Sequence, residues 1–128
     1  MLKKVNQIKK LSYKIRKIIL DISYNCGEPS HIGGALSIVE ILSVIYSNFD
    51  IKINKPFDRF ILSKGHGFLA LLSILHCKGF IKKKKDLMQF QKNESEFIAH
   101  PIMNKSIGIE TSNGSLGQGL SFGVGLAI

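Results

Sequence analysis

Cysteines and long apolar runs are both scarce in this sequence of 128 residues. Cys26 and Cys77 lie far apart and form no Cys-x-x-Cys pair, so we expect free buried thiols, because a zinc site needs more ligands close in sequence. No apolar run approaches the roughly 20 residues of a membrane span. The basic start continues into an amphipathic stretch, so we expect no signal peptide, a cytoplasmic location and no membrane partner.

Arginine is rare as well, although the formal net charge is +9. Arg16 and Arg59 are the only arginines, and the rest of the 18 basic residues are lysines. Arginine is the usual reader of bases and clamp for phosphates, so this ratio argues against specific nucleic-acid recognition. The lysine run at residues 82–85 is typical of a solvated helix entry. Nucleic-acid binding is therefore the least favoured function class.

The chain has enough apolar residues, 45%, for the core of one small domain, and no internal repeat or linker divides it. Apolar residues at spacings of three and four predict an amphipathic helix over residues 5–22. Gly27 can take a left-handed turn after it, and Pro29 prevents its continuation. Ser37 and Glu40 form an S-x-x-E pattern, which predicts a capping box at the start of a second helix.

The remaining segments mix helical and strand signals. In chain order they predict a buried strand at 59–62 preceded by Pro56, a tight turn at 64–67, a helix at 68–78 closed by Gly79, a short helix at 86–92, an irregular functional loop at 93–113 and a tightly packed helix at 120–128. This order of helices, turns and one strand indicates an α/β fold class, although one convincing strand makes a thin sheet.

Three histidines lie beside turn residues, and a fourth lies within a helical pattern. His31, His66 and His100 neighbour glycine or proline, so the backbone there can approach a ligand that the imidazole faces. Taken singly, each is more typical of a structural loop histidine than of a catalytic one, and packing best explains His76. Spacing leaves open a zinc site built from the three loop histidines. Zinc ligands usually include a close pair, however, and these lie about 35 residues apart.

A glycine-rich segment, residues 114–119, opens the last expected helix. Exposed N–H groups and the positive end of the helix dipole would favour an anion there. The pattern is neither a P-loop, which needs a following Gly-Lys-Ser or Gly-Lys-Thr, nor the dinucleotide fingerprint in its strand-turn-helix setting. By itself the segment is more typical of a helix entry that packs tightly.

Four ordered segments resemble the transketolase family. They read Ser-His-Ile-Gly-Gly-Ala-Leu-Ser at 30–37, Asp-Arg-Phe-Ile-Leu-Ser-Lys-Gly-His-Gly at 58–67, Ala-His-Pro at 99–101 and Ile-Glu-Thr-Ser-Asn-Gly-Ser-Leu-Gly-Gln-Gly at 109–119. The likeness covers nearly the whole chain and is strongest to the N-terminal subunits of split transketolases. A deoxyxylulose-phosphate synthase would have a different histidine turn. The family often has Gly-His-Pro where this chain has Ala-His-Pro.

The resemblance implies an incomplete thiamine-diphosphate-binding fold, helix-rich with a partial parallel sheet, and one partial domain at residues 1–128. His66 matches the histidine beside the cofactor diphosphate. The aminopyrimidine would be held by Gly114, Ser115 and Leu116. These four residues are therefore the expected cofactor-binding set.

His31 and His100 match the histidines that face the sugar and the reacting part of the cofactor, so they are the expected catalytic residues. The implied activity moves a two-carbon ketol unit between sugar phosphates, a transferase reaction of carbohydrate metabolism in the pentose phosphate route. Imidazoles that titrate near neutrality can exchange protons with sugar hydroxyls. The thiazolium of the cofactor stabilises the carbanion.

Two family features are not found in these 128 residues. One is the Gly-Asp-Gly…Asn motif that holds Mg²⁺ or Ca²⁺ on the diphosphate, so no residue is assigned as a metal ligand and cofactor affinity should be weak. The other is the activating glutamate of the pyrimidine-side domain. We therefore expect no turnover unless another polypeptide supplies both, and the partner implied by the resemblance is a complementing C-terminal subunit or a homodimer partner. The alternative is a non-catalytic degenerate fragment or interaction module.

Overall fold

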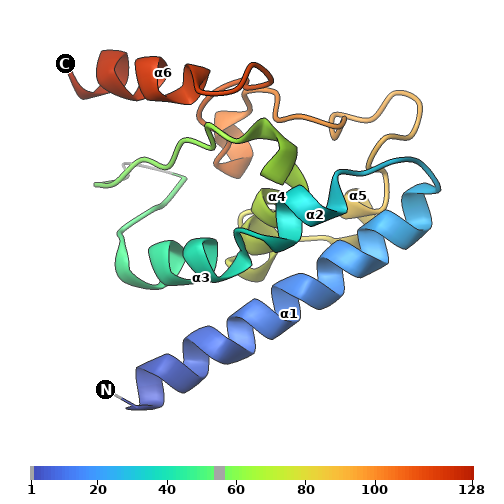
Figure 1. The fold of residues 1–128 in the computed structure, drawn as a ribbon, viewed down its shortest axis with the longest axis horizontal. Coiled ribbons are helices and arrows are strands. Elements are labelled where there is room, and N and C mark those ends of the chain that lie inside the picture. Colours follow the sequence, from blue (N-terminus) through green and yellow to red (C-terminus); the bar gives the residue numbers. More distant parts are fainter. Residues whose placement is uncertain (1, 54–56) are drawn as a thin grey trace.

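The computed structural model describes residues 2–53 and 57–128, and within these ranges the chain is helical with irregular connections. The α-helices are α1 (Leu2–Cys26), α2 (Ile32–Leu36), α3 (Val39–Asn48), α4 (Phe68–Cys77), α5 (Lys84–Leu87) and α6 (Gln118–Ala127), and two short 3₁₀ turns are η1 (Gly65–Gly67) and η2 (Lys105–Ile107). Figure 1 shows α1 along one edge of the molecule and α6 at the opposite edge. None of the described helices is long and apolar enough to cross a membrane.

The core lies between α1, α3 and α4. Every residue of α4 from Phe68 to Leu75 is buried, because α1 and α3 cover it. The predicted stripe of α1 faces this helix, and its members Ile15, Ile19 and Ile22 have no exposed surface. Each such side chain contributes roughly 1.5–3 kcal/mol relative to an exposed position. The core therefore forms from helices that are adjacent in space and far apart in sequence.

The expected helix ends at glycine are confirmed for α1 and α4. Gly27 follows α1 with φ of 72° and Gly79 follows α4 with φ of 83°, both in the left-handed region that glycine adopts most readily. Helix α1 begins at Leu2, earlier than the apolar stripe predicted. A buried hydrogen bond of 2.9 Å, donated by the Ser12 hydroxyl to the Ser43 hydroxyl, joins α1 to α3.

The predicted capping box at the start of the second helix is wrong. Helix α3 follows Ile38, and no side-chain hydrogen bond caps it. The Ser37 hydroxyl instead donates to the Gly34 carbonyl and accepts from Lys64 Nζ at 2.8 Å. Glu40 pairs with Arg16 of α1 at 2.7 Å, and this hydrogen bond holds the pKa of the Glu40 carboxyl below its usual range. Tertiary partners therefore replace the local cap.

The expected α/β fold class with a partial parallel sheet is also wrong. Residues 59–62 form no strand, and β pairing in the described part of the chain is limited to one isolated bridge between Asn104 and Ile109. The apolar run packs against helices: Leu62 is buried, and the Phe60 ring meets Tyr46 of α3 edge-on at 5.5 Å. A strand needs a neighbouring backbone to pair with, and here side-chain packing alone accounts for the apolar signal. The expected preceding Pro56 lies outside the described residues.

The later helices match the predictions unevenly. The helix expected at 68–78 is confirmed as α4, and a helix at 120–128 is confirmed as α6. The tight packing expected of α6 is wrong beyond Gly119, because Leu120 and Val124 are exposed.

The helix expected at 86–92 is displaced to α5. Gln91 has φ of 57°, and its backbone N–H donates to the Phe97 carbonyl at 2.7 Å. This turn stops a helix from continuing through residue 91. Cys26 is buried and Cys77 half-buried, and both are free as predicted.

Candidate functional site

Three histidines from separate loops meet at one place. The ring centroids lie 4.6 Å apart for His31 and His66, 4.9 Å for His66 and His100, and 5.5 Å for His31 and His100. One nitrogen of each ring lies within 4.8 Å of the others. His31 is exposed and the other two are half-buried. We call this group the histidine cluster; its convergence is what the resemblance implied.

The three members of the histidine cluster lie in short or irregular segments between the longer helices. His66 lies in η1, directly before the buried helix α4. His100 precedes Pro101 in an irregular loop. His31 precedes α2 and has φ of 50° and ψ of 35°, a left-handed conformation that is uncommon for a residue other than glycine. Backbone strain of this kind costs about 1–3 kcal/mol and is often found at functional positions.

The loop that carries His31 is tied to its surroundings at several points. The hydroxyls of Ser23 on α1 and Ser30 form a hydrogen bond. Gln91 Nε2 donates to the Pro29 carbonyl at 3.1 Å, and Lys92 Nζ donates to the Cys26 carbonyl at 2.8 Å. These contacts stabilise the unusual backbone of His31 by fixing the residues before it.

Two glycines let the histidine loops approach one another. A Cβ at Gly34 would lie 2.9 Å from the His66 carbonyl oxygen. A Cβ at Gly65 would lie 2.8 Å from the Asn113 carbonyl oxygen and 3.0 Å from Cδ2 of the His100 ring. Real side chains rarely tolerate such distances, so larger residues here would push the loops apart. In the sequence these glycines indicated close approach to a ligand, and in the structure they allow close approach between loops.

The fourth motif joins the same site through Asn113. This residue is 3% exposed, and its backbone N–H donates to the Pro101 carbonyl at 3.1 Å, beside His100. Its side-chain amide donates to Thr111 Oγ1 at 2.6 Å. Asn113 Oδ1 is buried without a hydrogen-bond partner among the described residues. Sequence reasoning gave Asn113 no role, because nothing in its pattern distinguishes it from a turn residue.

The segment expected to hold the aminopyrimidine follows Asn113 directly. Its three residues, Gly114, Ser115 and Leu116, are all exposed. Gly119, at the start of α6, packs so closely on the second motif that a Cβ there would lie 2.5 Å from the Cα of Ser63. The second and fourth motifs therefore run side by side. Their proposed roles in binding remain predictions, since no ligand contact tests them.

Within the histidine cluster, the surroundings of His100 lower the pKa of its imidazole. Partial burial, followed by the nearby rings of His66 and His31, holds the pKa of His100 below its usual value. The His100 imidazole is therefore neutral at pH 7, with one nitrogen able to donate a hydrogen bond and the other able to accept a proton. His76 differs: its Nδ1 lies 2.8 Å from the Ile81 carbonyl oxygen, a structural contact that agrees with its expected packing role.

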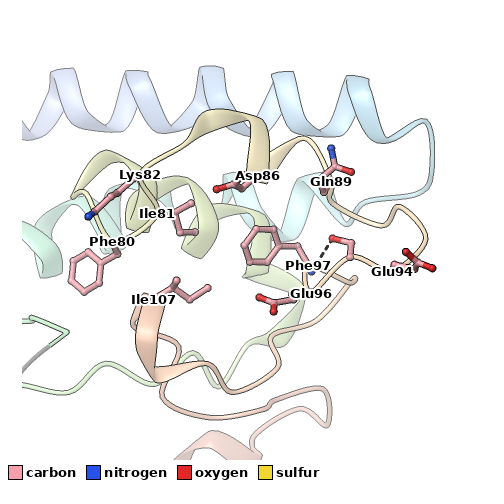
Figure 2. A pocket seen from close by; sticks show the side chains of 10 residues that line it. Phe80, Ile81, Lys82, Asp86, Gln89, Glu94, Glu96, Phe97 and Ile107 are labelled. Carbon is pink, nitrogen blue, oxygen red and sulfur yellow. Dashed lines mark hydrogen bonds between the residues drawn. The ribbon is translucent and has the colours of Figure 1, made fainter.

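A cavity of about 330 Å³ lies elsewhere, between α5 and η2. Figure 2 shows its apolar lining, which includes Phe80 and Phe97, beside the carboxylates of Asp86, Glu94 and Glu96. No member of the histidine cluster lines it. Because carboxylates repel phosphate oxygens, this cavity is a poor place for a diphosphate.

Comparison with known proteins agrees with these motifs. The sequence matches the family described as transketolase, thiamine diphosphate binding domain, over residues 8–128. It is 36% identical over 126 residues to a transketolase of Buchnera aphidicola subsp. Acyrthosiphon pisum, 32% to transketolase 1 of Escherichia coli K12 and 35% to transketolase 1 of Pasteurella multocida. Each match covers 94% of this chain and 19% of the relative, so the chain spans about a fifth of their length. The chain belongs to the transketolase thiamine diphosphate binding domain family.

Proposed function

We propose that this chain binds thiamine diphosphate at the histidine cluster and forms part of a ketol-transfer site. The observation that carries the proposal is that all four family motifs meet there, with three imidazoles and the Asn113 backbone in contact across separate loops. Convergence of polar groups from distant segments is the usual construction of a binding site on loops.

The groups present fit the diphosphate end of the cofactor. The His66 ring can donate a hydrogen bond to a phosphate oxygen, and the ammonium of Lys64, held by the Ser37 hydroxyl, adds positive charge to the adjoining turn. A Cβ at Gly33 would meet nothing within 4 Å, so the backbone beside His31 is open to a ligand. These features favour an anion close to His66.

The fourth motif fits the aminopyrimidine end. Gly114, Ser115 and Leu116 expose their backbone, and a Cβ at Gly114 would meet nothing within 4 Å. Asn113 Oδ1 is a buried acceptor in need of a donor, and an amino group can supply one. A buried acceptor left unpaired costs about 1–3 kcal/mol, which a ligand donor would recover.

The chemistry divides between the cofactor and the chain. Thiamine diphosphate, when bound, supplies the thiazolium that stabilises a carbanion. His100, neutral at pH 7, can accept a proton from a hydroxyl of the sugar phosphate and return it to the product. His31 lies on the exposed side of the cluster, where it can orient the same hydroxyls. These roles would support transfer of a two-carbon unit, and we propose that the chain serves pentose phosphate metabolism in the cytoplasm.

The metal that accompanies the diphosphate calls for another source of ligands. Within the described residues, the group of side chains able to share an ion is the histidine cluster, which offers nitrogen. Mg²⁺ and Ca²⁺ prefer oxygen ligands. We therefore propose that the metal ligands and the activating glutamate come from outside these residues, for example from a complementing chain, and that these residues alone do not turn over.

A non-catalytic interaction module is the second candidate, and the surface of α6 favours it. Leu120, Val124 and Leu126 are 75%, 58% and 43% exposed on this helix. Apolar side chains gathered on one element are a feature of interaction surfaces. In this reading α6 binds a partner and the histidine cluster only stabilises the loops.

Calorimetric titration of the chain with thiamine diphosphate and Mg²⁺ separates the two. Saturable binding that His66→Gln weakens by roughly tenfold or more is expected from loss of a charge-assisted hydrogen bond. His76→Gln is the matched control, since that ring contacts the Ile81 carbonyl. The interaction module is favoured if no binding is detected and if light scattering gives the mass of a monomer both with and without the cofactor. Robust ketol transfer by the chain alone would contradict the need for a partner.

A further inference from the structure

The histidine cluster has the composition of a transition-metal site. It presents three imidazoles, and one nitrogen from each lies within 4.8 Å of the other two. Imidazole nitrogen suits Zn²⁺, Co²⁺, Ni²⁺ and Cu²⁺ and suits Mg²⁺ poorly. Three histidines with an open fourth position are also a known arrangement for zinc.

The geometry needs only small movements to close on an ion. Zinc–nitrogen bonds of 2.0–2.1 Å in a tetrahedral site put ligand nitrogens about 3.3 Å apart. The cluster must therefore contract by up to roughly 1.5 Å, which ring rotation about broad χ2 torsions can supply. His31 is exposed and His66 and His100 are half-buried, so water can reach the cluster and fill the fourth position.

The backbone holds the three ligands near this arrangement before any ion arrives. The contact of Gly34 with the His66 carbonyl fixes the first loop on the second, and the contact of Gly65 with the His100 ring fixes the second on the third. The ties that hold the His31 loop to Gln91 and Ser23 complete the support. Ligands that are already assembled lose less entropy on binding.

We propose that His31, His66 and His100 form a three-histidine site for a transition-metal ion, in which each residue gives one nitrogen and water completes the coordination. The ion would occupy the same three histidines as the proposed cofactor site when thiamine diphosphate is absent, and its nitrogen ligands differ from the oxygen ligands of the metal on the diphosphate. Spacing in the sequence argued against it, because the ligands lie about 35 residues apart, but folding removes that objection. The proposal does not depend on cofactor binding.

The first test uses the unaltered full chain without thiamine diphosphate. Zn²⁺ is titrated while the side-chain resonances of all four histidines are followed by NMR. One equivalent should shift the rings of His31, His66 and His100 and leave His76 unchanged. Co²⁺ should give the intense visible ligand-field spectrum of a tetrahedral site. Shifts confined to His76, or no saturable change, would overturn the proposal. Because the titration contains no cofactor, its result tests the metal site even if the chain does not bind thiamine diphosphate.

Variants provide the second test by calorimetry with Zn²⁺. His31→Asn suits the left-handed backbone, since asparagine tolerates it, and His66→Gln and His100→Gln keep polar side chains of similar length. Removing a residue that only supports a metal ligand lowers metal affinity about 10–100-fold. Removing a ligand itself should therefore lower the affinity for Zn²⁺ at least about 100-fold.

The controls for these variants are His76→Gln and Cys77→Ser, which should bind Zn²⁺ like the original chain. Circular dichroism checks that every variant folds. Excess Mg²⁺ should fail to displace Zn²⁺, because nitrogen ligands disfavour it. The proposal would be overturned if the three cluster variants bound Zn²⁺ with unchanged affinity. It would also be overturned if Cys77→Ser lost as much Zn²⁺ affinity as they do, or if Mg²⁺ displaced bound Zn²⁺.

Discussion

Helices α4 and α6 have the same length, and both carry many apolar residues, but they are opposite in burial. Every residue of α4 from Phe68 to Leu75 is buried, whereas Gly119 is the buried residue of α6. On α6, Leu120 is 75% exposed, while Leu72 on α4 is 0% exposed. The comparison shows that apolar residues allow a helix to be buried, whereas the neighbouring elements determine whether burial occurs.

The neighbours of the two helices explain the difference. Helix α4 is covered by α1, α2 and α3. Helix α6 meets the irregular segment before η1, where a Cβ at Gly119 would press on Ser63 and one at Gly123 would lie 3.8 Å from Ile61 Cδ1. Figure 1 shows it far from α1. The stable part of the molecule is therefore the helical core, and α6 is attached at its first turn.

Amide hydrogen exchange should show the largest contrast between the two helices. Amides of α4 can exchange only when the whole core unfolds, so they should report the global free energy of unfolding. Amides of α6 beyond its first turn should exchange by local opening, at least about 1,000-fold faster. Mass spectrometry of peptides from each helix measures this. Equal protection would mean that α6 is covered in solution, by another copy for example.

Matched leucine truncations should differ next most. Leu72→Ala in α4 should lower the free energy of unfolding by about 2–5 kcal/mol, because it leaves a cavity in the core. Leu120→Ala in α6 should change it by less than about 0.5 kcal/mol, because that side chain is mostly in water. Urea denaturation of both variants provides the measurement. Similar losses in the two would contradict the burial contrast.

Glycine substitutions within α6 should have opposite signs. Gly119→Ala should destabilise the chain by about 1–3 kcal/mol, because the new Cβ meets the Ser63 backbone at 2.5 Å. Gly123→Ala should stabilise it by about 0.5–1 kcal/mol, because the new Cβ finds an ordinary contact and alanine favours the helix. Thermal unfolding compares the variants. A stabilised Gly119→Ala variant would show that α6 does not dock at its first turn.

The smallest expected contribution to the free energy of unfolding comes from the rim of the core, where Arg16 of α1 pairs with Glu40 of α3. The pair is exposed, so a double-mutant cycle with Arg16→Gln and Glu40→Gln should give about 0.2–1 kcal/mol. Folding lowers the Glu40 pKa, so the folded state favours the ionised carboxylate. This contribution should be complete above the ordinary carboxyl pKa and fade as pH falls below about 4. A coupling free energy between Arg16 and Glu40 that increases as the pH falls would contradict this prediction.

Predictions from the sequence succeeded where one local rule acted without competition. The apolar stripe of α1 and the glycines after α1 and α4 follow from helix geometry and left-handed backbone preference. The predictions failed where a tertiary contact replaced the expected local interaction. Ser37 bonds Gly34 and Lys64 instead of capping α3, and residues 59–62 pack on Tyr46 without pairing as a strand. The α5 boundary moved because the Gln91 backbone bonds Phe97.

The candidate site was predictable in its members and not in its construction. The motif resemblance named His31, His66 and His100, but the roles of Gly34, Gly65 and Asn113 as loop contacts emerged only from distances between segments far apart in sequence. The same distances reveal the three-nitrogen group that spacing disfavoured.

By itself, the sequence determined the longer helices, where α1 and α4 end and which family the motifs belong to, because these depend on residues near one another in the chain. Only the tertiary structure decided that α4 is enclosed and α6 exposed, and that three distant imidazoles share one site. Burial and convergence depend on which surfaces meet, and that is a property of the whole fold.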